Sequence, residues 1–502
     1  MSTYNGSQFI GFAACFPRVL PRWLYARLFC PAKSNGNAAI PAPAGLRKVE
    51  AVLVESGIPE EDVEIVHPMR IRKAVDSDTR VVGVTTSDPL GKGPASSTFS
   101  SLIRREPYTA YYFRELLTHE ALRSDDLRVI VGGPGVWQLA DPNVRASLGI
   151  DCIVEGEAEL VAPRLFRDAL EGAPLPGTVS GGTVPMEKVP VMRGPTINGT
   201  VEVSRGCGRG CEFCNPNMRR VRHVPLEKIL DEIRLNIPHS PKVTLHAEDV
   251  LRYKADGIVP DKDEVLRLFS EATKLTDDIG ISHIALSSAL SRPDLEEELA
   301  DLLKCLGTGA HIYAQTGIET GSSRLVSRHM KGKAKPFSPE DWPEVVRESM
   351  KLLSGNGWVA CGTLVLGMPG EQTDDVLRTL ELVRDLRRYK SLIVPLFFVP
   401  LGEMTESDFF TPEGMLPEHW MLLAECIDHD FHWSGILMDE LFSQNRMSGA
   451  KSRLMKFAAW YMQRRLKPYM ETMKEGVSPL EGVAGLEEPP HAFEIGRQKA
   501  KA

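Results

Sequence analysis

The stretch that decides how this chain folds runs from residue 203 to residue 216 and reads Val203-Ser204-Arg205-Gly206-Cys207-Gly208-Arg209-Gly210-Cys211-Glu212-Phe213-Cys214-Asn215-Pro216. Its three cysteines have the spacing C-x3-C-x2-C and lie in a glycine-rich loop after a short strand-like run. Cysteine thiolates bind iron, and a cubane [4Fe–4S] cluster normally takes four of them. Three close cysteines without a fourth nearby would leave one iron open to a substrate or cofactor.

The alternative interpretation of this loop is a zinc knuckle. Zinc sites usually take four protein ligands, with paired C-x2-C spacings and a distant second pair. The remaining cysteines of this chain are all single, and no second pair exists: Cys15, Cys30, Cys152, Cys305, Cys361 and Cys426. The spacing therefore favours the iron–sulfur cluster.

The composition is that of a globular protein. The 502 residues suffice for two or three domains, and 42% of them are hydrophobic, so the chain can bury large cores. The net charge of −8 argues against nucleic acid as a partner. No run of about 18 apolar residues predicts a membrane span, and no signal peptide is expected. Single cysteines and an oxygen-labile cluster indicate a reducing, anaerobic cytoplasm.

Residues 40 to 185 alternate between helix and strand patterns. Residues 44–57 read as a helix, and residues 80–86, 128–131 and 150–154 read as buried parallel strands. The second strand runs into Gly132-Gly133-Pro134-Gly135, and the third into Glu155-Gly156-Glu157-Ala158-Glu159. Strands that alternate with helices form a doubly wound sheet, and ligands bind at the carboxyl ends of its strands.

At its cysteine loop the chain resembles the radical S-adenosylmethionine (SAM) superfamily. The resemblance implies a [4Fe–4S] cluster on Cys207, Cys211 and Cys214, with the amine and carboxylate of SAM on the open iron. In that family an electron from the cluster cleaves the sulfonium to give a 5′-deoxyadenosyl radical. An external electron donor is therefore an implied partner.

The segment that follows resembles the partial (β/α)6 barrel of the same superfamily. Strands are predicted at residues 242–246, 283–287, 311–316, 359–367 and 392–399, with a helix at 225–237. Chemistry in barrels sits at strand carboxyl ends. The segments 245–249, 316–322 and 367–371 resemble the family's GGE, GIESGS and GxPGET motifs. The resemblance implies that SAM contacts Phe213, Glu248 or Asp249, Glu319, Ser322 and Gly367.

The two glycine turns resemble, in their order, the cobalamin-binding domain upstream of many radical SAM domains. The resemblance implies cobalamin contacts at Thr86, Ser87, Gly132, Gly133, Gly135, Glu155, Gly156 and Glu157. Neither histidine of residues 1–185 lies in a D-x-H-x-x-G motif, so no histidine of that domain is expected to coordinate cobalt in this way. The one such stretch in the chain, Asp430 to Gly435 around His432, lies in the helix expected at 417–442. The alternative is a Rossmann-like domain that binds nothing.

Two long helices are expected beyond residue 400, at 417–442 and 451–473, and the tail from Ser478 is expected to be flexible. Within the first helix Cys426, His429 and His432 are spaced three residues apart. They form either a metal site or a face packed on the barrel. Three ligands on one helix favour the packed face.

The predicted fold is α/β in four parts: a Rossmann-like cobalamin-binding domain (1–185), a linker (186–199), a radical SAM partial barrel (200–400) and a helical C-terminal region (401–502). The resemblance implies a cobalamin-dependent radical SAM C-methyltransferase that acts on an unactivated sp3 carbon. The family mechanism uses two SAM molecules, one to form methylcobalamin and the other to generate the radical. The catalytic side chains of the substrate pocket are not identified by the sequence.

The layout also resembles archaeal methylases that modify methyl-coenzyme M reductase. That resemblance implies a peptide or protein substrate, for example a glutamine side chain, and neither nucleic acid nor membrane as a partner. One alternative is a cobalamin-dependent radical SAM cyclase or rearrangement enzyme acting on a small molecule. A methylthiotransferase would need a second cluster, and the other cysteines offer no triad. A corrinoid-sensing regulator would leave the cysteine motif unexplained.

Overall fold

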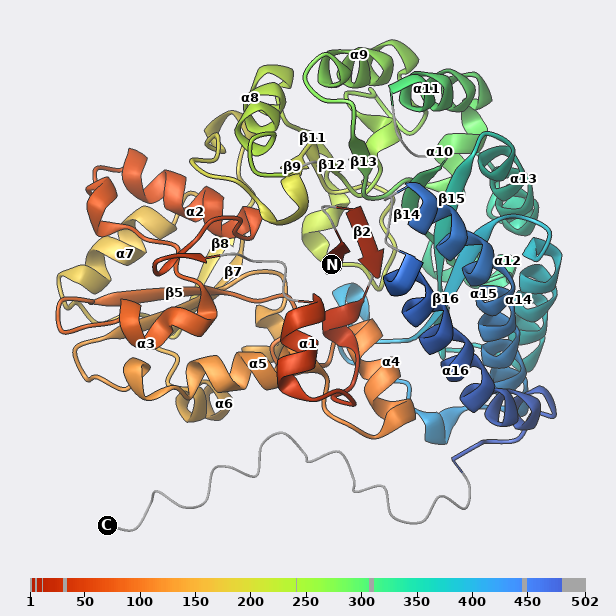
Figure 1. Ribbon diagram of the computed structural model, residues 1–502, viewed down its shortest axis with the longest axis horizontal. Helices are drawn as coiled ribbons and strands as arrows, with labels where there is room; N and C mark the ends of the chain where they lie inside the picture. The colour runs from red at the N-terminus through yellow and green to blue at the C-terminus, as the bar shows by residue number, and fades with distance from the viewer. Residues whose placement is uncertain are drawn as a thin grey trace. The chain divides into compact units, whose positions relative to one another are not determined.

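The computed structural model describes residues 2–4, 7–10, 12–29, 34–240, 242–306, 311–444 and 449–480. Cys30 and the tail beyond residue 480 lie outside these ranges. The chain forms two compact units, which are described separately: residues 1–201 with 224–242, and residues 202–223 with 243–484 (Figure 1). Among the described residues, no helix is long and apolar enough to cross a membrane.

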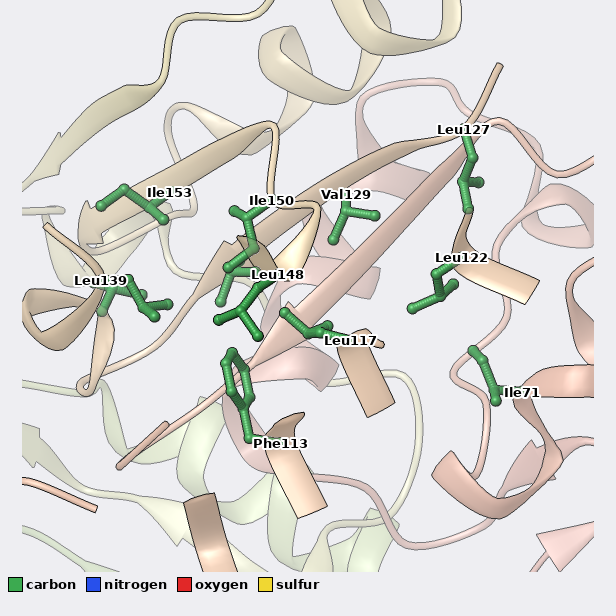
Figure 2. Close-up of a cluster of buried hydrophobic side chains, with 12 residues drawn as sticks. Ile71, Phe113, Leu117, Leu122, Leu127, Val129, Leu139, Leu148, Ile150 and Ile153 are labelled. Atoms are coloured by element: carbon green, nitrogen blue, oxygen red, sulfur yellow. The ribbon is translucent and has the colours of Figure 1, made fainter. Parts of the chain in front are cut away.

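The first unit is built on a parallel sheet with the strand order β5 (Val81–Thr85), β6 (Arg128–Gly132), β7 (Cys152–Gly156) and β8 (Thr178–Gly182). Successive side chains of a strand point to opposite faces, and here both faces are apolar. Val129 and Val131 pack with Phe113 and Leu117 on one face (Figure 2). The opposite face is covered by another cluster, which contains Ile130, Cys152, Val154, Leu165 and Ala169. The predicted α/β fold with a parallel sheet is confirmed, and its strands lie in sequential order.

The described helices of the first unit are α1 (Arg22–Phe29), α2 (Ala44–Glu55), α3 (Ile71–Ala74), α4 (Pro94–Ile103), α5 (Tyr108–Leu117), α6 (Pro142–Leu148), α7 (Ala162–Leu170) and α8 (Leu226–Asn236). Helices α3, α5 and α6 contribute to the first of the two apolar clusters, and α7 contributes to the second. Two short antiparallel pairs precede them, β1 (Ser2–Tyr4) with β2 (Ser7–Ile10) and β3 (Ser34–Asn35) with β4 (Ala38–Ala39).

By its contacts helix α8 groups with the first unit, although its residues lie in the segment 200–400 predicted for the barrel. Two buried polar residues of α8 account for this. Glu232 forms an ion pair with Lys48 of α2, and the Asn236 side-chain oxygen accepts a hydrogen bond from the Thr196 amide at 2.8 Å. Buried polar groups need such partners, so α8 is held to these residues.

The second unit contains the parallel strands β12 (Val243–His246), β13 (Ile279–Ile281), β14 (Ile312–Glu319), β15 (Trp358–Leu366) and β16 (Ser391–Phe397). The chain enters it through β9 (Thr200–Glu202). A single bridge between His283 and Gln315 continues the pairing from β13 to β14. The strands follow one another in the order expected of a partial barrel.

The strand predicted at residues 283–287 is wrong. Only His283 forms a bridge, and residues 286–291 form helix α10. Ser287 and Ser288 are buried; the Ser287 hydroxyl donates to the Lys333 carbonyl at 2.8 Å, and the Ser288 hydroxyl donates to Asp249 at 2.7 Å. These tertiary hydrogen bonds outweigh the strand-like alternation of the segment.

Helices cover the outer side of the barrel strands. Their bounds are α9 (Lys262–Thr273), α10 (Leu286–Ser291), α11 (Pro293–Leu306), α12 (Ser323–His329), α13 (Trp342–Gly355), α14 (Thr373–Leu386), α15 (Pro417–Gln444) and α16 (Gly449–Lys474). Helix α13 packs on β15, and α15 packs on β16 (Figure 1). Along β14 and β15, fully buried residues alternate with partly exposed ones. The partly exposed set lines the inner face, where a ligand would lie.

Candidate functional site

The three cysteines lie in a loop between β10 (Ser204–Arg205) and β11 (Arg222–His223), and all three are partly exposed. The amides of Cys207 and Gly208 both donate to the Met218 carbonyl at 3.0 Å. Gly206 has φ +81°, and a Cβ atom there would stand 2.4 Å from the Arg220 carbonyl oxygen. The loop therefore needs glycine at this position to fold back on itself.

Arg209 fastens the loop to the barrel. Its guanidinium donates to the carbonyls of Gly332, Lys333 and Lys335 at 3.0–3.2 Å, and to the Ser288 hydroxyl at 2.8 Å. Arg252 adds a hydrogen bond of 2.5 Å to the Cys207 carbonyl. The sequence analysis missed both arginines. The position of Arg209 between two of the cysteines could have indicated its role, because a long guanidinium side chain at that position can donate hydrogen bonds to neighbouring carbonyls.

The donor set of this loop fits an iron–sulfur cluster. Burial raises the pKa of the Cys211 thiol to about 11 and that of Cys214 to about 12, so thiolates there require a bound cation. Within the described ranges, no group of three or more His, Cys, Asp or Glu side chains is arranged to hold a single metal ion. In a cubane cluster each thiolate binds a different iron, so the three sulfurs need not converge on one point.

Glu248 and Asp249, which the sequence left as alternatives, have different surroundings. Asp249 is only 4% exposed, and it accepts hydrogen bonds from the Ser288 hydroxyl at 2.7 Å, the Ala285 amide at 3.1 Å and Arg209 at 3.3 Å. No hydrogen bond joins the partly exposed Glu248 carboxylate to another described residue. Glu248 interacts electrostatically with Cys214. Of the two acids, Glu248 is the one free to receive the ammonium group of a ligand.

Glu319 lies at a bulge of β14 and has an unusual backbone conformation. The register with β15 shifts between Gly317 and Glu319, and Glu319 has φ +63°. A bulge re-aims a side chain, and here the carboxylate reaches the Lys333 ammonium at 2.9 Å. Although burial alone would lower the pKa of Lys333, the Glu319 charge raises it. The predicted ligand-facing acid is therefore held in place by a buried lysine.

The other predicted SAM contacts lie around the same loop. Phe213 occupies the turn between Cys211 and Cys214 and is partly exposed. The Ser322 hydroxyl is buried, donates to Asp375 at 2.5 Å and caps α12. Gly367 has φ +79°, and a Cβ atom there would stand 1.9 Å from the Phe410 ring. The Ser322 hydroxyl is therefore engaged in hydrogen bonds within the protein, and position 367 requires glycine to avoid a clash with the Phe410 ring.

Polar residues of the inner face that the sequence analysis did not single out lie near Glu248. The rings of His246 and His283 meet edge to face, with centroids 5.9 Å apart. Burial lowers the pKa of His283, opposed by the charge of Glu248, so its ring is neutral at pH 7. Gln315 is hydrogen-bonded to His283. The period-2 alternation that puts His246 and Glu248 on one side of the chain is the signal that could have found this group.

The predicted cobalamin contacts gather at the carboxyl edge of the first unit's sheet. The Thr86 amide donates to the Gly132 carbonyl at 2.9 Å, and the Gly135 amide donates to the Thr86 carbonyl at 3.0 Å. A Cβ atom on Gly133 would stand 2.5 Å from the Thr86 oxygen, and one on Gly135 would stand 2.5 Å from Ser87. These glycines permit the two loops to pack on each other.

Three of the predicted residues at this edge remain exposed: Ser87, Glu155 and Gly156. The Glu157 carboxylate instead accepts a hydrogen bond from the Val184 amide at 2.9 Å. The described histidines of this unit are His67, His119 and His239, and the first two cap short helices by accepting backbone hydrogen bonds of 3.1 Å. The edge is therefore open to a ligand, with no described histidine at the strand ends.

Cys426 and His429 are buried, and His432 is exposed. The His429 ring lies 3.0 Å from the Ser391 hydroxyl of β16, and burial lowers its pKa to about 4. This arrangement agrees with the packed helix face that the spacing favoured.

Comparison with known proteins agrees with this geometry. The family model described as the Radical SAM superfamily matches residues 201–383. The tRNA-2-methylthio-N(6)-dimethylallyladenosine synthase of Desulforamulus reducens is 27% identical over 208 residues, which are 40% of this chain and 42% of the relative. An uncharacterized methyltransferase of Pyrococcus horikoshii, PH0819, is 23% identical over 377 residues, 68% of this chain and 73% of the relative. This chain spans about two fifths of the first curated relatives it matches.

Two solved structures of TsrM from Kitasatospora setae, a radical SAM methyltransferase, share the fold. One contains tryptophan substrate and the SAM analogue aza-SAM, and it has a TM-score of 0.54. The other contains cobalamin and a [4Fe–4S] cluster, with a TM-score of 0.53. Each is 18% identical to this chain and covers 72% of it, and 72% and 74% of the solved chains are covered in turn. Residues 201–383 of this chain, which begin with the three-cysteine loop, are a radical SAM domain.

Proposed function

We propose that this protein is a cobalamin-dependent radical SAM C-methyltransferase that methylates an unactivated sp3 carbon of a peptide or protein, for example a glutamine of methyl-coenzyme M reductase. One observation carries the proposal. The likeness to TsrM covers 72% of the chain, well beyond the segment 201–383, so it extends to the first unit as well. An open sheet edge is thus combined in one chain with a radical SAM domain.

In this proposal the residues of the second unit divide the work of holding the cofactors. Cys207, Cys211 and Cys214 would hold the cluster, and Glu248 would receive the SAM ammonium in a charge-assisted hydrogen bond. Glu319 would face SAM from the bulge of β14. The bound cluster and SAM supply a radical that abstracts hydrogen, while the chain orients the reactants and keeps water away.

The first unit would hold cobalamin at its open edge. Exposed Ser87, Glu155 and Gly156 would meet the cofactor there, and the packed glycine turns would keep the edge in shape. No described histidine of this unit lies at the strand ends, which favours binding without a histidine on cobalt. A spectrum of the cobalamin-loaded chain that lacks histidine coordination is the expected result.

The test of the function is an anaerobic reaction of the full chain with SAM that carries a CD3 group. Peptides that contain the candidate glutamine serve as substrates, and products are measured by mass spectrometry. We expect a CD3-bearing product together with 5′-deoxyadenosine, and neither with Cys207→Ala. Cys152→Ala is the matched control, because Cys152 lies buried in the first unit's sheet. 5′-Deoxyadenosine with an altered but unmethylated substrate would favour the cyclase alternative.

A further inference from the structure

Helix α16 exposes apolar and aromatic side chains far beyond what the surface of a folded domain normally shows. Every residue from 460 to 469 is exposed. Leu454 is 67% exposed, Phe457 59% and Trp460 50%. Single exposed apolar residues are ordinary, but a contiguous set marks a binding surface.

The helix is nevertheless attached to the barrel unit by its other side. Met470 and Met473 are buried, and Lys456 forms an ion pair with Asp439 of α15. With 3.6 residues per turn, Leu454, Phe457 and Tyr461 lie on the side opposite these methionines. Helix α16 thus packs on α15 along part of its length, while its stretch 460–469 is exposed on every side.

Helix α16 is also strongly basic along its length. Helix α16 has seven basic residues and a single acidic one, in a chain whose net charge is −8. Arg464 lies over the Trp460 ring at 5.7 Å, and the rings of Phe457 and Trp460 lie 5.6 Å apart. The aromatic side chains and arginines are therefore interleaved, which is typical of the centres of protein–protein interfaces.

A shallow hollow lies at the C-terminal part of the face. It is lined by Tyr461, Arg464, Arg465, Pro468 and Tyr469 and has a volume of about 440 Å³. Such a hollow accepts a side chain of the partner, and the arginines beside it match carboxylates in bidentate geometry. Exposed aliphatic Leu454 and Met462 cannot stack on bases, so the face suits a polypeptide better than a nucleic acid.

We propose that the outward face of α16, from Leu454 to Tyr469, is a docking surface for an acidic protein segment in which carboxylates alternate with apolar side chains. The carboxylates would pair with Arg464 and Arg465, and the apolar side chains would cover Phe457, Trp460 and Tyr461. The docking does not depend on methyl transfer, so it can be tested apart from the proposed function.

The experiment measures binding to the full chain by fluorescence anisotropy. The probe is a labelled peptide of four Glu-Leu-Glu-Phe repeats, and its controls have Lys in place of Glu or Ser in place of Leu and Phe. We expect the acidic apolar peptide to bind, and the affinity to fall at least tenfold between about 0.05 and 0.5 M salt. Both control peptides should bind at least tenfold more weakly.

Variants locate the binding on α16. Arg464→Glu/Arg465→Glu and Trp460→Ala should each weaken binding about tenfold or more, as is usual for central interface residues. Arg164→Glu/Arg267→Glu carries the same charge change on exposed side chains elsewhere and should leave binding unchanged. Unfolding midpoints equal to the parent's show that the variants fold.

Three results would overturn the proposal. They are equal binding of all three peptides, binding that both α16 variants leave intact, and tighter binding of a single-stranded oligouridine or of anionic phospholipid vesicles than of the acidic peptide. The last result would assign the face to nucleic acid or to a membrane surface. Loss of methyl transfer with peptide binding intact would refute only the proposed function.

Discussion

Replacement of the adjacent acids Glu248 and Asp249 should have opposite consequences. Asp249 is buried and neutralises the guanidinium of Arg209, which fastens the cysteine loop. In Asp249→Ala this guanidinium loses its counterion, and the hydroxyl of Ser288 loses its acceptor. Removal of one partner from a buried ion pair costs about 3–5 kcal/mol. Glu248→Gln removes a partly exposed carboxylate without a protein partner and should cost less than about 0.5 kcal/mol.

Thermal unfolding and SAM binding together separate the two roles. In a unit of this size 1 kcal/mol shifts Tm by about 2–4 °C, so Asp249→Ala should lower the transition of the barrel unit by at least about 6 °C. Glu248→Gln should keep the parent Tm. It should weaken anaerobic SAM binding about 10- to 150-fold, because a hydrogen bond between charged groups contributes about 1.5–3 kcal/mol.

Asp249→Asn is the matched control, since it keeps an acceptor for Ser288 and removes only the charge. It should fall between Asp249→Ala and the parent in Tm. The reasoning is refuted if Asp249→Ala unfolds at the parent temperature and binds SAM weakly, while Glu248→Gln binds SAM normally. Asp249 would then be the residue that contacts SAM, and its carboxylate would have to be accessible to the ligand in the functional protein.

Three further predictions concern stability and are checked by denaturant midpoints. Gly133→Ala should destabilise the first unit by more than about 1 kcal/mol, because residue 133 has φ +102° and its new Cβ atom would lie 2.5 Å from a carbonyl oxygen. The control Gly132→Ala should be tolerated, because its Cβ atom meets nothing nearer than 4.0 Å. Equal unfolding midpoints of the two variants would contradict this. Burial raises the pKa of Glu296 to about 8, above its unfolded value, so the free energy of unfolding should fall as the pH rises from 4.5 to 8. Glu296→Gln should remove this pH-dependent loss of stability, which amounts to about 3 kcal/mol at pH 7. If parent and variant lose stability in parallel as the pH rises, the prediction is refuted. Lys333→Met should destabilise the barrel unit by leaving the Glu319 carboxylate without its partner, and addition of Glu319→Gln should restore part of the midpoint if the two groups are coupled.

The strands of both units could be predicted because each is a short, mostly apolar run bounded by turn residues. The strand predicted at 128–131 is β6, and the one at 359–367 is β15. The strand prediction for residues 283–287 failed because the decisive contacts are with residues distant in the sequence. Ser287 and the next residue, Ser288, form hydrogen bonds to the Lys333 carbonyl and to Asp249, which lie far away in the sequence. Tertiary partners of this kind have no sequence signature.

The sequence indicated where the candidate site lies better than it indicated which of its side chains are available to a ligand. The order of the strand-end motifs predicted that these segments lie near the cysteine loop. It could not show that Ser322 caps α12 and bonds Asp375, or that Gly133 serves contact between two loops. The sequence does not distinguish a glycine or serine that a ligand requires from one that the backbone requires. Only the neighbouring atoms in the structure distinguish the two cases.

One rule read from the structure does separate scaffold from ligand contact, and it applies at the end of β12. Leu245, Ala247 and Asp249 are buried, while His246 and Glu248 are partly exposed. Successive side chains of an extended chain point to opposite sides, so the parity continues from the strand into the motif. An acid on the buried side must find protein donors, as Asp249 does with Arg209 and Ser288. An acid on the open side is left without such donors among the described residues, which is why the loss of SAM binding is predicted for Glu248 and not for Asp249.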